Sequence, residues 1–237
     1  MRPIYGFRVP LVAAAVCPHP PLIVPRLAAG AAPELDPLRT ACADAVVALR
    51  TSGADRLVVV GTAHATGWLD PPYGGTFAPW GEPVEVGEPG RSLPLSLLVG
   101  RWLLDGPPDG MLAGMLAVAA DTPPAACLAL GADAVADGPV ALLVMGDGSA
   151  RHGERSPGYA DPRADPFDRA VAAALAAGDP AGLAALDPAL AAELWVAGRA
   201  AWQVLAGACG PAAAPWRAKL HYDGAAYGVG YLVASWT

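Results

Sequence analysis

The sequence predicts an α/β fold, namely a three-layer α/β/α sandwich around a mostly parallel central sheet. Short apolar runs rich in β-branched residues, each stopped by Pro or Gly, indicate interior strands. Between these runs lie segments whose apolar residues recur at helical spacing, and strands that alternate with helices are typical of a parallel sheet covered on both faces. No internal repeat or linker interrupts the pattern, so we expect a single domain over residues 1–237.

The first strand, helix and strand form one βαβ unit. The strand at residues 12–16 runs into a Pro-His-Pro-Pro segment that contains His19. The helix expected at residues 36–49 starts with an Asp-Pro pair, and proline suits the first helical turn because its missing N–H has no partner there anyway. After a Ser-Gly stop, the second strand begins at residue 57 and ends at His64.

The rest of the chain continues this alternation. We expect helices at 93–104, 123–134, 165–177 and 189–208, strands at 140–145 and 228–234, and either a strand or an apolar helix at 111–119. Residues 67–92 are rich in Gly, Pro and aromatic side chains. Because long ordered loops are uncommon unless they are functional, this segment is either a wall or lid over a pocket or a surface loop anchored by its aromatics.

Composition narrows the class of protein. The net charge of −7, the single lysine and the lack of any basic stretch argue against nucleic acid as a partner. No apolar run is long enough to span a membrane, and the N-terminal stretch does not resemble a signal peptide. The four cysteines form no CxxC pair, which predicts neither a zinc ribbon nor a disulfide framework and is typical of a reduced, cytoplasmic protein.

His19 and His64 are candidate metal ligands. Both follow buried strands, and open α/β sheets bind ligands beyond the carboxyl ends of their strands. Two histidines and one carboxylate leave coordination positions of Fe(II) open for substrate and dioxygen. Glu193 is the candidate carboxylate, because it lies between apolar helix residues and a buried carboxylate needs a partner or a metal. Ordinary hydrogen-bonded histidines and a glutamate on a helix surface are the alternatives.

A second polar segment follows the strand at residues 140–145. Its sequence, Gly-Asp-Gly-Ser-Ala-Arg-His-Gly at residues 146–153, is neither a P-loop nor a Gly-x-Ser-x-Gly nucleophile elbow. His152 is a candidate acid/base group because imidazole titrates near neutrality, and a solvated loop histidine is the alternative. The run at residues 221–223, His-Tyr-Asp, could supply a partner for a ligand or a further ligand.

The order of these motifs resembles the catalytic subunits of class III extradiol ring-cleavage dioxygenases. The matching order is a strand ending in Pro-His-Pro-Pro, a strand ending in His, and a strand ending in Gly-Asp-Gly-Ser-Ala-Arg, and it covers most of the chain. The segments 146–151, 157–164 and 227–231 are similar to a small, alanine-rich actinobacterial branch of this superfamily. The resemblance implies an α/β/α fold, a mononuclear non-haem iron and insertion of both atoms of O2 into a catechol-type ring.

The resemblance also implies roles for individual residues. His19 and His64 match the two iron-binding histidines, and Glu193 is the nearest candidate for the glutamate ligand, although aligning residues 202–208 with the family's closing helix places Gly198 at that position. The family's acid/base histidine directly follows a Gly-x-x-Ser turn. Ala150 occupies that position here, and the nearest histidine is His152.

The leading hypothesis is therefore an extradiol dioxygenase-like enzyme. Fe(II), or zinc or another divalent metal, would be bound by His19, His64 and Glu193, with His152 as the acid/base and a small aromatic compound and O2 as substrates, in a possible homo-oligomer. The rival hypothesis is a catalytically altered family member that binds a small molecule, another metal or a protein partner in the same cleft. A metal-dependent hydrolase is a third alternative.

Overall fold

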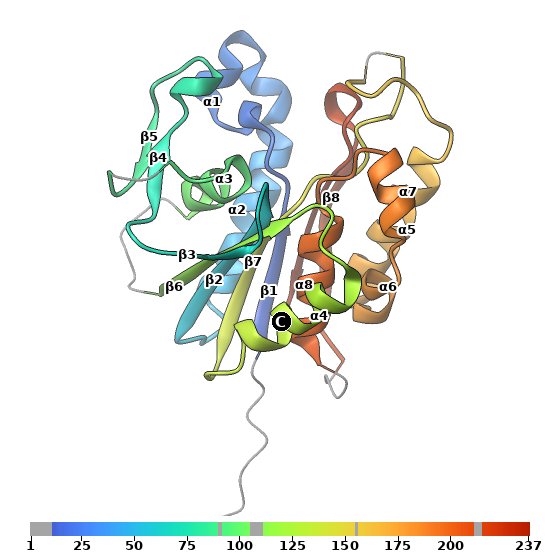
Figure 1. Ribbon diagram of the computed structural model, residues 1–237. Helices are drawn as coiled ribbons and strands as arrows, with labels where there is room; N and C mark the ends of the chain where they lie inside the picture. The colour runs from blue at the N-terminus through green and yellow to red at the C-terminus, as the bar shows by residue number, and fades with distance from the viewer. Residues whose placement is uncertain (1–10, 90–91, 105–110, 155, 211–214) are drawn as a thin grey trace, which may run out of the picture.

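The computed structural model describes residues 11–89, 92–104, 111–154, 156–210 and 215–237. Its centre is a seven-stranded sheet with the order β3-β6-β2-β7-β1-β9-β8 (Figure 1). The strands of this sheet are β1 (Leu11–Cys17), β2 (Arg56–Ala63), β3 (Gly67–Leu69), β6 (Leu112–Ala119), β7 (Val140–Met145), β8 (Ala218–Gly224) and β9 (Tyr231–Trp236).

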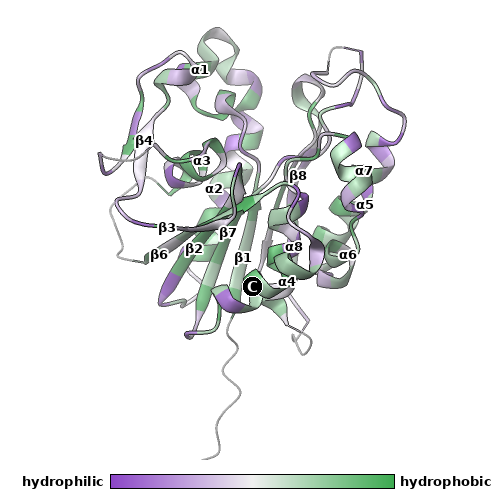
Figure 2. Ribbon diagram, viewed as in Figure 1, coloured by the Kyte–Doolittle hydropathy of each residue, from purple (hydrophilic) through white to green (hydrophobic). Residues whose placement is uncertain are grey.

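The four inner strands β6, β2, β7 and β1 run parallel. They are almost entirely buried, as their apolar runs require when helices cover both faces, and they are green along most of their length in Figure 2. β3, β9 and β8 join antiparallel at the two sides. Strand β7 therefore lies between β1 and β2, and the carboxyl ends of all three strands meet at one edge of the sheet.

Helices form the two outer layers. On one face lie α2 (Asp36–Arg50) and α3 (Leu95–Leu103), which pack their apolar sides on the sheet together with Phe77 and Val86. The other face carries α4 (Pro124–Ala134), α5 (Ala164–Ala177), α6 (Pro180–Ala184), α7 (Pro188–Glu193) and α8 (Arg199–Cys209). The short α1 (Pro25–Ala28) follows β1. This confirms the predicted three-layer sandwich.

The structure shows which kind of element residues 111–119 form, and it corrects the helix predicted at residues 189–208. Residues 111–119 contain strand β6, not a helix. The single helix predicted at residues 189–208 is two helices, because α7 ends at Glu193 and the next residues leave helical geometry, with Trp195 at a φ of +55°. We call residues 194–198 the α7–α8 connector.

Two further segments differ from the predictions. Residues 218–224, which the sequence did not mark as a strand, form β8 at the edge of the sheet. In the aromatic segment at residues 67–92, three short strands form: β3, and the pair β4 (Gly74–Thr76) and β5 (Glu85–Gly87), which make a small second sheet. Phe77 is buried while Trp68 and Trp80 are exposed. Residues 90 and 91 lie outside the described residues.

All four cysteines are buried and free. Among the residues that the structure describes, no helix is long and apolar enough to cross a membrane.

Candidate functional site at the carboxyl edge of the sheet

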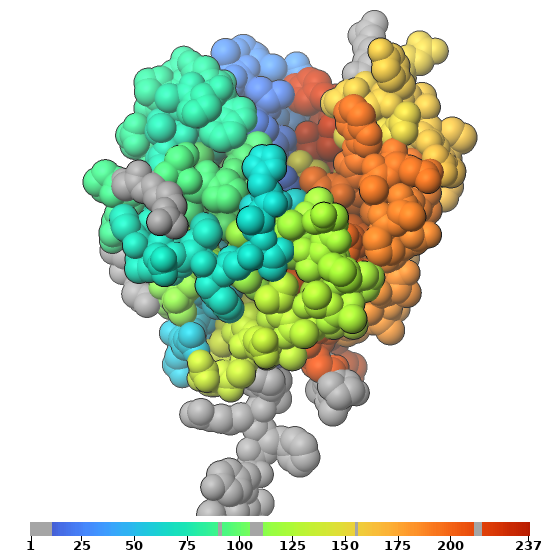
Figure 3. Space-filling view, viewed as in Figure 1, coloured from blue at the N-terminus to red at the C-terminus, as the bar shows by residue number. Residues whose placement is uncertain are grey.

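His19 and Asp147 meet at the carboxyl edge of the sheet. Cys17 and Met145 are paired at the ends of β1 and β7, and His19 and Asp147 each follow by two residues. The backbone N–H of His19 donates a hydrogen bond of 2.7 Å to Oδ1 of Asp147, and His19 Nδ1 lies 3.6 Å from the same oxygen. The surface is hollowed at this edge, between the blue-green and the orange segments (Figure 3).

The side chain of His19 is buried, and that of Asp147 is 15% exposed. His19 is 8% exposed, and its Nδ1 is buried without a hydrogen-bond partner. Burial raises the pKa of Asp147 above its ordinary value, while the charge of His19 and its backbone N–H act in the opposite direction. A buried polar atom without a partner calls for a specific explanation, and a role in binding an ion or ligand is one of the usual ones.

His64 follows the neighbouring strand. Gly61 of β2 pairs with Met145 of β7, so His64 and Asp147 extend beyond the same end of two adjacent strands, which are spaced about 4.8 Å apart in a sheet. The side chain of His64 is exposed and has no hydrogen-bond partner among the described residues. His19 and His64 thus lie on either side of Asp147, at the ends of β1 and β2.

Glu193 is not part of this group. It is the last residue of α7, its side chain is 56% exposed, and its Oε2 accepts a hydrogen bond of 2.6 Å from Nη1 of Arg163. Within the described part of the chain, no three His, Cys, Asp or Glu side chains are close enough together to hold a metal ion. Neither the predicted set of His19, His64 and Glu193 nor a set of His19, His64 and Asp147 is therefore assembled as a metal site, and the carboxylate beside His19 is Asp147.

Sequence reasoning missed Asp147 although one signal pointed to it. Asp147 follows its strand by the same two residues as His19 follows β1. The sequence does not reveal strand order, however, and only the position of β7 between β1 and β2 brings Asp147 between the two histidines. The sequence favours Glu193 because it lies between apolar helix residues, whereas in the structure it ends α7 and its side chain is exposed.

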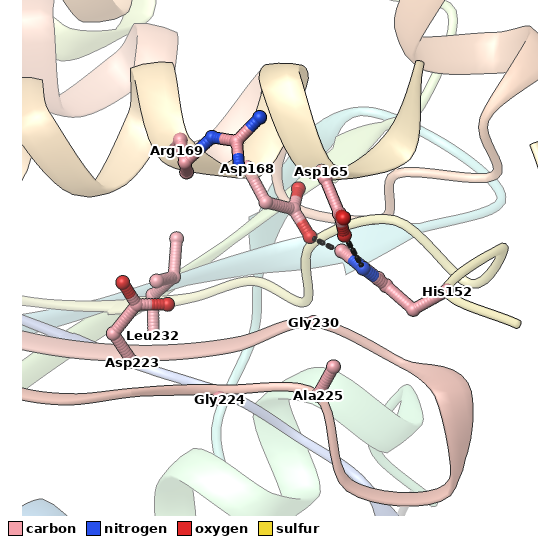
Figure 4. A pocket seen from close by; sticks show the side chains of 9 residues that line it. All are labelled: His152, Asp165, Asp168, Arg169, Asp223, Gly224, Ala225, Gly230 and Leu232. Atoms are coloured by element: carbon pink, nitrogen blue, oxygen red, sulfur yellow. Dashed lines mark hydrogen bonds and ion pairs between the residues drawn. The ribbon is translucent and has the colours of Figure 1, made fainter. Parts of the chain in front are cut away.

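His152 lies between two carboxylates of α5 (Figure 4). Its Nε2 is 2.6 Å from Oδ2 of Asp168 and its Nδ1 is 2.7 Å from Oδ1 of Asp165. Asp168 is buried and also accepts the backbone N–H of Ser149 at 3.0 Å. Burial acts to lower the pKa of His152, but the hydrogen bonds and charges of Asp168 and Asp165 outweigh it, so the pKa is raised.

A pocket of about 260 Å³ opens beside His152. Its lining consists of charged side chains and the ends of β8 and β9, namely His152, Asp165, Asp168, Arg169, Asp223, Gly224, Ala225, Gly230 and Leu232. Asp223 belongs to the predicted 221–223 run, whose histidine, His221, instead contacts Ser235 Oγ at 2.8 Å. His152, Asp168 and Asp223 thus line one pocket, and His19 is not among the residues that line it.

The α7–α8 connector lies across the carboxyl edge. The amide of Gly198 donates to the carbonyl of Asp147 at 2.8 Å, and the hydroxyl of Thr62 donates to the carbonyl of Ala197. At the start of the connector, the carbonyl of Leu194 accepts from the Ser149 hydroxyl at 2.9 Å. These bonds fasten the connector to the ends of β2 and β7.

Comparison with known proteins supports the fold only. No protein-family model matches the chain, and no curated protein matches it. Among solved structures, the chain is similar to the crystal structure of the uncharacterized protein JW3007 from Escherichia coli K12, with a TM-score of 0.52 and 15% identity over 94% of this chain and 99% of that chain. At that identity the similarity shows that the two chains share a fold.

Proposed function

We propose that this chain is a mononuclear metal enzyme of the extradiol dioxygenase type, with His19, His64 and Asp147 as the protein ligands. The observation that supports it is the buried Nδ1 of His19, which has no hydrogen-bond partner, beside the half-buried carboxylate of Asp147. This pair lies at the carboxyl edge of a parallel sheet, where α/β proteins bind their ligands. Asp147 takes the place that the sequence hypothesis gave to Glu193.

The ligand types suit iron. Two imidazoles and one carboxylate form the facial set that non-haem Fe(II) oxygenases use, and the bound metal would supply open positions for a catechol and for dioxygen. Oδ1 of Asp147 accepts the His19 backbone N–H, which orients the carboxylate, and Oδ2 accepts no hydrogen bond from the described residues. His64 does not converge with this pair in the structure, so metal binding would require its ring to turn toward them; the ring is exposed and has no hydrogen-bond partner among the described residues.

The proposed reaction opens a catechol-type ring. The carbon–carbon bond beside a hydroxyl-bearing carbon breaks, both atoms of O2 enter the product, and no external reductant is consumed. The connector over β7 and β2 would help to keep water out, because its buried residues Leu194 and Val196 anchor it at the edge of the sheet.

One observation favours a second candidate, a family member that binds a ligand at this edge without cleaving it. The acid/base histidine of the sequence hypothesis, His152, has both ring nitrogens engaged by Asp165 and Asp168. A histidine held in this way does not offer a free nitrogen to a substrate bound at His19. General acid/base groups contribute about 10²–10⁴-fold in rate, so a site that lacks one would bind its ligand with turnover slowed by about that factor.

The test is anaerobic reconstitution with Fe(II), followed by exposure to a panel of catechols and O2. We expect one iron per chain in the natural protein, at least about tenfold weaker binding in His19→Ala and Asp147→Asn, and unchanged binding in the control Glu193→Gln. Catechol-dependent O2 uptake would support ring cleavage, whereas iron and catechol binding without O2 uptake would support the second candidate. Iron binding that survives in His19→Ala and Asp147→Asn would refute both.

A further inference from the structure

His152 is held by two carboxylates that lie one turn apart on α5 (Figure 4). Its Nε2 lies 2.6 Å from Oδ2 of Asp168, and its Nδ1 lies 2.7 Å from Oδ1 of Asp165. Residues three apart on a helix face the same way, so α5 presents both carboxylates to one ring. A neutral imidazole carries one N–H, whereas the imidazolium carries two. While both carboxylates are charged, both contacts are therefore hydrogen bonds only when His152 is protonated.

The two contacts differ in what it costs to break them. The Asp168 side chain is 7% exposed and also accepts the amide of Ser149 at 3.0 Å, whereas the Asp165 side chain is 68% exposed. A buried carboxylate that loses its hydrogen bond is left without a partner, but an exposed one is hydrated by solvent. Loss of one proton should therefore break the contact between Nδ1 and Asp165, and leave the Nε2–H donated to Asp168.

The other charged groups around the ring do not replace the lost contact. Besides the two aspartates, the charged residues that line the pocket are Arg169 of α5 and Asp223 of β8, and neither has a hydrogen-bond or ion-pair partner among the described residues. The turn between β8 and β9 contributes the carbonyl of Gly228, which accepts the His152 amide at 3.1 Å. Burial acts to lower the pKa of His152, but the two aspartates outweigh it, so the ring loses its proton above its ordinary value of 6.5.

We propose that His152 and Asp165 form a proton-operated latch, which fastens the loop at residues 146–153 to the first turn of α5 while the imidazole is protonated and opens when the imidazole is neutral. Asp168, one turn further along α5, keeps its contacts with the loop in both states. In the open state Nδ1 is free to accept a hydrogen bond from a ligand in the pocket, which the closed state prevents. The latch needs no metal at His19, so it does not depend on the proposed function.

The first measurement is nitrogen-15 NMR of the histidine rings from about pH 5 to pH 9, with each ring assigned through its backbone. The shifts of the two ring nitrogens report which of them carries the proton. We expect His152 to lose one proton above pH 6.5 and to keep the other on Nε2. His221 is the internal control, because its ring contacts the Ser235 hydroxyl at 2.8 Å and burial lowers its pKa.

The variant Asp165→Asn removes the latch from an exposed position. It should keep the proton of the neutral ring on Nε2 and lower the pKa of His152 by about 0.5, as expected for an exposed ion pair. Glu154→Gln is the matched control and should leave the pKa of His152 unchanged, since Glu154 is an exposed carboxylate of the neighbouring chain that makes no hydrogen bond to the ring.

Hydrogen exchange measures the opening itself. The reporters are the amides of His152 and Phe167, which are bonded to the carbonyls of Gly228 and Arg163 on the two sides of the latch. After correction for the intrinsic effect of pH, both amides should exchange about threefold faster at pH 8.5 than at pH 6 in the natural protein. In Asp165→Asn they should exchange equally fast at both values.

Four results would overturn the latch. A neutral ring with its proton on Nδ1 would show that Asp165 keeps its contact and Asp168 loses it. A pKa of His152 at or below 6.5 would leave no closed state near neutral pH. Exchange that rises with pH as steeply in Asp165→Asn as in the natural protein would separate the opening from Asp165. An equal fall of the pKa in Glu154→Gln would assign the effect to net charge.

Discussion

Replacing Asp168 with asparagine should destabilise the protein, because the substitution removes one buried negative charge. Asp168 binds Nε2 of His152 at 2.6 Å and accepts the amide of Ser149, and its side chain is 7% exposed. Asparagine keeps the shape but turns one hydrogen-bond acceptor into a donor and removes the charge. Hydrogen bonds to charged groups contribute about 1.5–3 kcal/mol and an unsatisfied buried group costs about 1–3 kcal/mol, so we expect a loss of about 2–3 kcal/mol.

Asp165→Asn is the matched control, since it removes the charge from the other nitrogen of the same histidine. The Asp165 side chain is 68% exposed, and exposed ion pairs contribute about 0–1 kcal/mol. Urea unfolding of the natural protein and both variants at pH 6 and pH 8.5 gives the comparison. Equal stability of Asp168→Asn and Asp165→Asn at pH 6 would refute the reasoning.

The pairing of His152 with Asp168 predicts that the stability of the protein depends on pH. The folded state raises the pKa of His152, so the stability that this pairing contributes is fully present below the unfolded value of about 6.5. It is lost as the pH rises through the raised, folded value. The natural protein should therefore lose more stability than Asp168→Asn between pH 6 and pH 8.5, and parallel pH profiles would contradict the assignment of His152 to this pair.

Two further predictions concern glycines. Gly230→Ala would place a Cβ 1.9 Å from Oδ2 of Asp168, so the substitution should displace that carboxylate. We expect a loss of at least about 2 kcal/mol in the free energy of unfolding by urea. A stability within about 0.5 kcal/mol of the natural protein would contradict this close contact between Gly230 and Asp168. Gly53 has a φ of +77° in open space, so Gly53→Ala should cost about 1 kcal/mol from backbone strain alone. Gly30 is equally open but lacks a positive φ, so Gly30→Ala should be neutral or stabilising by up to about 1 kcal/mol, and the reverse order of the two would refute the strain argument.

The alternation of apolar runs was enough to predict the layers and the inner strands, because burial on both faces leaves a continuous signal in sequence. It was also enough to place His19 and His64 at strand ends. Strand β8 escaped prediction because it is an edge strand with a register shift between Leu220 and Tyr222, which breaks the alternation. Edge strands are only partly buried, so their patterns are weaker.

Predicting which carboxylate lies beside His19 required information that the sequence does not carry. The apolar positions around Glu193 fit one helix, and nothing local marks the turn at Trp195, where glycine would have been the usual signal. Asp147 was recognisable only as a polar residue after a strand. Its role depends on the order of strands, which is a property of the whole sheet. The partners of His152 likewise come from α5, which begins more than ten residues later.

The most direct test of the account is a crystal structure of the protein loaded with Fe(II) under anaerobic conditions, with anomalous data collected at the iron edge. We predict a single strong peak bound by His19, His64 and Asp147, at distances of about 2.0–2.2 Å as is usual for nitrogen and oxygen ligands. A peak elsewhere, for example in the pocket beside Asp168 and Asp223, or bound iron that excludes Asp147, would contradict the proposed site.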